Sequence, residues 1–108
     1  MSKQTPQGRA IEALEAAGWV VDVVERINRV RGMTWRNDLF GAFDLLAVND
    51  AGDIKAVQVT SRSNVSARVN KIAELPVIGR LRKAGWALEV WGWGKTVTKG
   101  DWLVVDVS

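Results

Sequence analysis

The sequence DLFGAFDLLAVNDAGDIKAVQVTS runs from Asp38 to Ser61 and predicts two β-strands joined by a short turn. The first strand contains a carboxylate, Asp44, between Phe43 and Leu45 in an otherwise apolar segment. Burying an ionised carboxylate costs free energy unless a cation, a hydrogen-bond donor or a metal ion compensates its charge. Asp44 is therefore the first candidate for a functional residue.

The turn between these strands predicts which of their side chains meet. If residues 50–52 form a three-residue turn with the glycine in the left-handed conformation, Asp44 faces Gln58 across the strand pair. Their Cβ atoms would then be about 5 Å apart on one face. Because side chains alternate along a strand, Thr60 shares that face and Lys55 points to the other.

The composition predicts a single globular domain spanning residues 1–108. Hydrophobic residues make up 47% of the chain and charged residues 25%, which is typical of globular proteins and argues against disorder. Cysteine and histidine are absent, so thiolate chemistry and histidine bases are excluded, leaving Asp, Glu, Lys and oxygen-ligated metals. We expect a cytoplasmic protein without signal peptide or membrane partner, because the N-terminus is polar and no apolar run is long enough to span a bilayer.

The rest of the chain predicts an α/β fold with a mixed central sheet flanked by helices, in the order α-β-β-β-α-β-β. Thr5 and Pro6 are suited to begin a helix that ends before Gly18. The other expected elements are a strand at 19–24, a loop at 28–37, a helix from Ser63 or Asn64 to Leu75, a short helix at 77–84, and strands at 86–93 and 101–107.

Basic residues gather in the loop at 28–37 and along the second predicted helix, where polar residues recur at helical spacing. These positions could contact the phosphates of a nucleic acid, or they could be ordinary solvated surface. Trp35 could contact bases or cover the core. The candidate nucleic-acid-binding residues are Arg29, Arg31, Arg36, Arg62, Asn64, Arg68 and Lys71.

A glutamate on the first helix, Glu12, followed by Asp44 and by Gln58-Val59-Thr60, resembles the PD-(D/E)XK nuclease superfamily. The likeness is greatest to the small archaeal-type Holliday-junction resolvases and VRR-type nucleases, and it covers roughly residues 6–75. It implies a restriction-endonuclease-like core and a metal-dependent DNA endonuclease, with branched DNA among its substrates.

The resemblance also implies a cofactor, Mg²⁺ or Mn²⁺, and a set of residues around it. The implied metal ligands are Asp44, Gln58, the carbonyl oxygen of Val59, and Glu12. The implied catalytic residues are Glu12, Asp44, Gln58, Thr60 and Lys71. Gln58 stands where the superfamily has an acid and Thr60 where it has a lysine, so a cation elsewhere would have to substitute; Lys71, Arg68, Arg62 and Arg36 are candidates.

Two alternatives remain beside the nuclease hypothesis. The chain could be a nuclease-fold module that binds nucleic acid or inhibits a partner protein without cutting, or an unrelated α/β protein in which Asp44 is structural. Because resolvases cut two strands of a junction with two-fold pseudo-symmetry, we also expect a homodimer. Its interface would include the aromatic surface around Trp91, Trp93 and Trp102.

Overall fold

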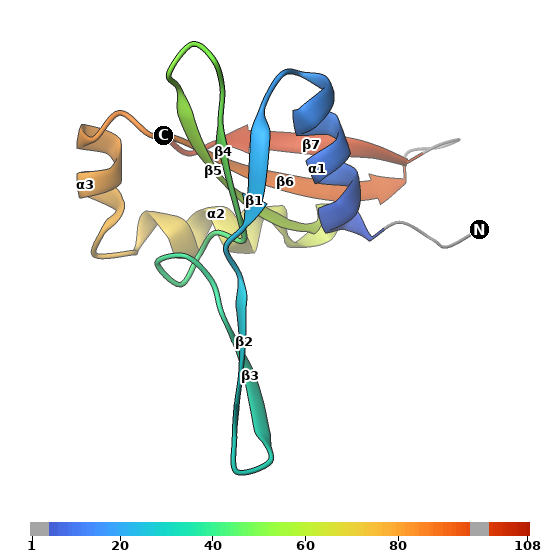
Figure 1. Cartoon of the computed structure of the whole chain (residues 1–108), viewed down its shortest axis with the longest axis vertical. Helices are drawn as coiled ribbons and strands as arrows, with labels where there is room; N and C mark the ends of the chain where they lie inside the picture. The colour runs from blue at the N-terminus through green and yellow to red at the C-terminus, as the bar shows by residue number, and fades with distance from the viewer. Residues whose placement is uncertain (1–4, 96–99) are drawn as a thin grey trace.

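The computed structural model describes residues 5–95 and 100–108, with the backbone alone described at 26–30, 34–36 and 95. Figure 1 shows a body built on one sheet and a slender arm that projects from it. The elements in chain order are α1 (Pro6–Ala16), β1 (Val20–Val23), β2 (Arg26–Val30), β3 (Met33–Asn37), β4 (Leu45–Val48), β5 (Ile54–Ser61), the short 3-10 helix η1 (Arg62–Asn64), α2 (Val65–Ala73), α3 (Ile78–Lys83), β6 (Ala87–Lys95) and β7 (Gly100–Asp106).

Helix α1 begins where the sequence predicts. The hydroxyl oxygen of Thr5 accepts a hydrogen bond from the backbone N–H of Gly8 at 3.0 Å, which satisfies one of the free donors at the helix start. Ala10 and Leu14, four residues apart, are buried against the sheet. Gly18 follows the helix with a φ of 95°, a conformation that glycine adopts without steric cost.

The central sheet contains five strands in the order β1-β4-β5-β6-β7. Strands β5 and β6 are parallel and the other neighbours are antiparallel, so the predicted α/β fold with a mixed sheet is confirmed. Helix α1 packs against one hydrophobic cluster, with Leu45 and Val57. Helices α2 and α3 pack against another, which includes Phe43 and Leu88. Both clusters contain residues of β4–β5 and its flanks, which places this strand pair at the centre of the fold.

The predicted register of β4 and β5 is confirmed. Leu45 pairs with Val57, and the backbone N–H of Asn49 donates to the carbonyl of Asp53 at 3.3 Å. Gly52 has a φ of 85°, as a three-residue turn with a left-handed glycine requires.

The prediction of a loop at 28–37 is wrong, because this part of the chain forms a separate two-stranded sheet of β2 and β3. Its polar and basic composition is typical of loops, but antiparallel pairing needs only backbone donors and acceptors. Arg31 and Gly32 both have positive φ, 51° and 80°, and form a tight turn between Val30 and Met33. The observed order therefore contains an inserted strand pair, whereas the short helix predicted at 77–84 is confirmed as α3.

None of the helices within the described residues has the length and apolar character that a membrane crossing requires.

Candidate functional site

The candidate site lies where β5 extends past the shorter β4. Pairing between these strands stops at Leu45 and Val57, whereas β5 continues to Ser61 with β6 as its neighbour. A cavity of about 710 Å³ opens at this overhang. Its lining residues are Thr5, Pro6, Gln7, Val23, Glu25, Asp38, Asp44, Gln58, Val59, Thr60, Ser61 and Arg68.

The side chain of Asp44 takes the place of a strand partner at this overhang. Its Oδ1 atom accepts a hydrogen bond from the backbone N–H of Val59 at 3.0 Å, while its own backbone N–H donates to the carbonyl of Val57 at 3.1 Å. Only 8% of Asp44 is exposed. The hydrogen bond satisfies a backbone donor that β4 is too short to reach, and it fixes the carboxylate beside Val59.

Gln58 contacts the other backbone group of the same residue. Its Nε2 donates to the carbonyl oxygen of Val59 at 3.1 Å, and its side chain is also buried. Asp44 and Gln58 thus both bind the backbone of Val59, and all three line the cavity. The juxtaposition predicted from the turn is present in the structure.

Burial raises the pKa of Asp44 from 3.8 to about 6. The hydrogen bond from Val59 acts in the opposite direction, and the negative charges of Asp38 and Glu25 raise the pKa further. Both the loss of solvent and the neighbouring negative charges therefore disfavour the charged form of Asp44. A cation bound in the cavity would relieve both costs.

Glu25 and Asp38 are two carboxylates of the site that the sequence analysis did not identify. Glu25 immediately precedes β2, Asp38 immediately follows β3, and both line the cavity. The Nε2 of Gln7, in the first turn of α1, donates to Oε2 of Glu25 at 3.4 Å. The sequence does show one acidic residue on each side of the segment 26–37. These two residues come together only because the segment folds into a hairpin.

Glu12, predicted as a metal ligand and catalytic residue, is exposed on α1 and is not among the residues that line the cavity. The reason is helical geometry. Glu12 is two residues from both Ala10 and Leu14, which face the sheet, so it points about 200° away from each of them. The first turn of α1, with Thr5 and Gln7, reaches the cavity instead.

Of the predicted basic residues, Arg68 on α2 lines the cavity. Lys71, predicted as a catalytic and nucleic-acid-binding residue, is exposed in the last turn of α2 and does not line it. Arg62 and Asn64 are exposed on η1. The side chains of Arg29 and Arg36 lie outside the described residues.

Lys55 points away from the cavity, as strand alternation predicts. Its Nζ lies 3.3 Å from Oε1 of Glu89 and 4.5 Å from the centre of the Trp19 ring. Thr60 is half-buried and lines the cavity. Arg68 is thus the one positively charged side chain among the described lining residues.

The oxygen atoms around Val59 fit a hydrated, weakly held Mg²⁺ rather than a dedicated metal cage. Within residues 5–95 and 100–108, no three acidic side chains are placed to hold a metal together. Mg²⁺ is commonly bound by one or two carboxylates and several waters. Rotation of the Gln58 amide would exchange Nε2 for Oε1 and leave two oxygens 3.1 Å apart, close to the roughly 3 Å that separates adjacent ligands at 2.1 Å from an octahedral ion.

Two of the three tryptophans of the predicted dimer surface, Trp91 and Trp93, pack against the third, Trp102. The rings of Trp91 and Trp93 lie 5.2 Å and 4.9 Å from that of Trp102, both edge to face. The guanidinium of Arg9 lies 4.6 Å from the centre of the Trp93 ring. These aromatic rings therefore make contacts within the protomer. The homodimer stays a prediction.

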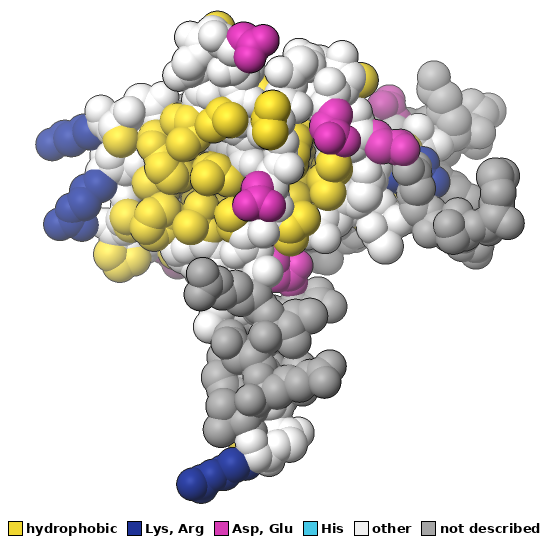
Figure 2. All heavy atoms as spheres, in the orientation of Figure 1, with side chains coloured by type: hydrophobic (Ala, Val, Ile, Leu, Met, Phe, Trp, Pro, Cys, Tyr) yellow, Lys and Arg dark blue, Asp and Glu magenta, His cyan; other side chains and the backbone are white. Residues whose placement is uncertain are grey.

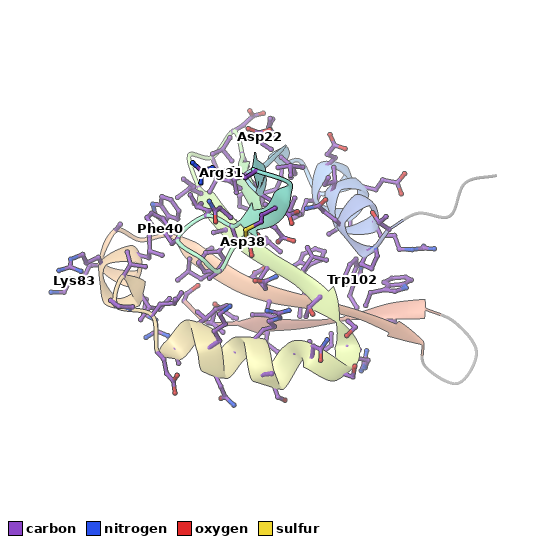
Figure 3. All side chains as sticks on the ribbon, turned by 90° about the horizontal axis from the view of Figure 1, so that it is seen from below. Asp22, Arg31, Asp38, Phe40, Lys83 and Trp102 are labelled. Atoms are coloured by element: carbon purple, nitrogen blue, oxygen red, sulfur yellow. The ribbon has the colours of Figure 1, made fainter. Side chains whose placement is uncertain are left out.

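Figure 3 looks at the molecule from below, along the arm. Asp38 lies near the middle of the body, at the base of the arm, while Trp102 and Lys83 lie toward opposite ends. The residues that line the cavity include Asp38 and none of the three tryptophans. The chain matches no protein-family model, no curated protein and no solved structure.

Proposed function

We propose that this protein is a metal-dependent endonuclease that hydrolyses phosphodiester bonds in DNA, with branched DNA among its substrates. The observation that carries the proposal is the placement of Asp44, Gln58 and the backbone of Val59 in one cavity at the end of β4. The order of Asp44 and Gln58-Val59-Thr60 along the chain, and their resemblance to the PD-(D/E)XK superfamily, supports it. A restriction-endonuclease-like core is part of the same proposal.

Each residue of the cavity then has a chemical role. Asp44 and the carbonyl oxygen of Val59 would bind Mg²⁺ or Mn²⁺, with Gln58 adding an amide oxygen. The bound ion supplies Lewis-acid activation of a phosphate and of a water molecule. Arg68 is placed to contact a phosphate oxygen, and the hydroxyl of Thr60 can donate a hydrogen bond to a water or a phosphate.

The test compares wild type with Asp44→Asn on linear, flapped and four-way-junction DNA, with Mg²⁺ or Mn²⁺. Asparagine keeps an oxygen that can accept from Val59 but removes the charge. We expect metal-dependent cleavage by wild type, loss of at least 100-fold in the variant, and weaker Mn²⁺ binding measured by electron paramagnetic resonance. Asp50→Asn, in the exposed turn, is the matched control and should behave as wild type. Absence of both cleavage and Asp44-dependent Mn²⁺ binding would rule the nuclease out.

The second candidate is a module that binds nucleic acid, or inhibits a partner, without cutting. The observation that favours it is the presence of Thr60 at the lysine position, with Arg68 as the one cation among the described lining residues. Such a module would bind DNA with a steep salt dependence, unaffected by Asp44→Asn and without product formation.

A further inference from the structure

We propose that the arm formed by β2 and β3 inserts into a groove of double-stranded DNA and so presents a strand of the duplex to the cavity at its base. The inference rests on the proposed function in taking DNA as the partner. Four properties of the arm support it: its shape, its charge, the conformation of its tip and the place where it joins the body.

The arm has the dimensions of a groove-binding ribbon. Each strand contributes five residues, paired in register from Arg26 with Asn37 to Val30 with Met33. At about 3.3 Å per residue the ribbon is roughly 15 Å long. The two strands contact chiefly each other, and Figure 1 shows them extending away from the body. The major groove of B-DNA, about 12 Å wide and 8.5 Å deep, admits a two-stranded ribbon.

The arm is also basic along its whole length. Residues 26–37 contain four of the fifteen basic residues and no acidic residue. Those four are Arg26, Arg29, Arg31 and Arg36. The segment therefore has a net charge of +4. Residues 62–83, which form η1, α2 and α3, are also basic, with six basic residues against one acidic residue. A duplex approaching the protein is attracted to the arm before the acidic cavity.

The tip holds an arginine in a conformation that arginine rarely adopts. Arg31 has a φ of 51° and is exposed, next to Gly32 at 80°. Turns with two such residues favour Asn-Gly, because asparagine tolerates the left-handed region. Figure 2 shows a basic side chain at the far end of the arm. Met33, beside the turn, is 69% exposed. The turn thus places a positive charge at the exposed tip of the arm, where it can contact a phosphate or a base edge.

The base of the arm is the rim of the cavity. Arg26 and Asn37 form the pair of the ribbon nearest the body. The next residues toward the body, Glu25 and Asp38, both line the cavity. A duplex held on the arm therefore has its backbone at the mouth of the cavity, where Asp44 and Arg68 lie. In this arrangement, a duplex that binds the arm at the same time places one of its phosphates at the cavity.

The test measures binding in EDTA, where a metal-dependent nuclease cannot cut. A fluorescent duplex of about 20 base pairs and its single strand are titrated with wild type, Arg31→Asn and Arg31→Lys. Because asparagine suits the turn, Arg31→Asn should keep or raise the melting temperature. We expect it to weaken duplex binding about 3- to 10-fold and to reduce the slope of log affinity against log salt by about 1. Arg31→Lys should retain duplex binding, and single-strand binding should change less than duplex binding.

Arg80→Asn on α3 removes the same charge from an exposed position away from the arm, and should change duplex affinity less than 2-fold. Equal duplex affinity of Arg31→Asn and wild type would overturn the proposal even if the protein cuts DNA. Loss of binding by Arg31→Asn and Arg80→Asn alike would also overturn it, as would a change in self-association without a change in DNA binding. Arm-dependent binding without cleavage in Mg²⁺ would uphold it and refute the nuclease proposal alone.

Discussion

The carboxylate of Asp44 accepts a hydrogen bond from the backbone N–H of Val59 at 3.0 Å, and the two residues lie one and two positions beyond the last pair of β4 and β5, Leu45 with Val57. A side chain therefore completes the edge of the sheet where the backbone of the neighbouring strand ends. The same contact holds a buried negative charge beside a backbone carbonyl that faces the cavity. The edge of the sheet and the proposed metal site thus both depend on this hydrogen bond.

Stability should depend on pH through Asp44. Its pKa is raised to about 6, so between about pH 4 and pH 6 the native state binds more protons than the unfolded state. The stability that Asp44 contributes is thus present below about pH 4 and lost as the pH rises through about 6. Asp44→Asn lacks this loss, so its stability relative to wild type should rise by about 3 kcal/mol between about pH 4 and pH 8.

Urea unfolding in EDTA across this pH range measures the effect. Asp44→Ala is the control for the hydrogen bond, because it removes the acceptor of the Val59 N–H as well as the charge. It should be less stable than Asp44→Asn by about 1 to 2 kcal/mol at each pH. A difference between Asp44→Asn and wild type that does not vary with pH would contradict the raised pKa.

Gln58→Glu should strengthen divalent metal binding. A second carboxylate beside Asp44 would add a negative charge at the proposed metal site, and we expect Mg²⁺ affinity to rise on the order of tenfold. Without metal, repulsion between two buried carboxylates should lower the melting temperature at about pH 8. Isothermal titration calorimetry and thermal melting with and without Mg²⁺ measure the two effects. Unchanged affinity would show that Gln58 lies outside any metal site.

Thr60→Lys should increase the rate of cleavage. The new ammonium group would enter the cavity and would stabilise developing negative charge. We expect an increase in kcat of about tenfold or more on DNA, with little change in KM. The matched control is Ser63→Lys, which adds the same charge at an exposed position of η1 that does not line the cavity. An equal increase in kcat for both variants would show that the gain comes from general attraction of DNA to the added charge.

Gly92→Ala should destabilise the fold. A Cβ atom at this position would overlap Cγ2 of Val65 and lie 2.9 Å from the backbone Cα of Arg62. We expect a loss of about 2 to 3 kcal/mol in the free energy of unfolding, because η1 and α2 must move away from β6. Gly79→Ala is the control, since nothing lies within 4 Å of its Cβ position and alanine favours the helix; it should be neutral or stabilising by up to about 1 kcal/mol. Equal effects in urea unfolding would contradict the close packing at Gly92.

The predicted homodimer can be tested by sedimentation velocity from about 1 to 100 μM. We expect a dimer in this range. Because Trp91 and Trp102 already pack on the core beside α1, Trp93→Phe is the mildest probe of the aromatic surface, and it should weaken self-association without unfolding the protomer. A monomer throughout the concentration range would contradict the prediction.

The sequence by itself determined the β4–β5 hairpin and the start of α1. A glycine three residues into the turn sets the register, and strand alternation then brings Asp44, Gln58 and Thr60 to one place while it turns Lys55 away. These relations are local, because they depend on backbone geometry over a few residues. The resemblance that assigned a role to Glu12 did not include its orientation, although Ala10 and Leu14 already defined the buried face of α1.

Only the tertiary structure decided the arm and the carboxylates at its base. Residues 26–37 lack the alternation of apolar residues that marks a half-buried strand, because the ribbon packs chiefly on itself rather than on the core. Glu25 and Asp38 are thirteen residues apart and come together because the strands between them pair. Backbone hydrogen bonds made that pairing without a hydrophobic pattern, so the sequence revealed Asp44 but not the acidic and basic surroundings that give it a proposed function.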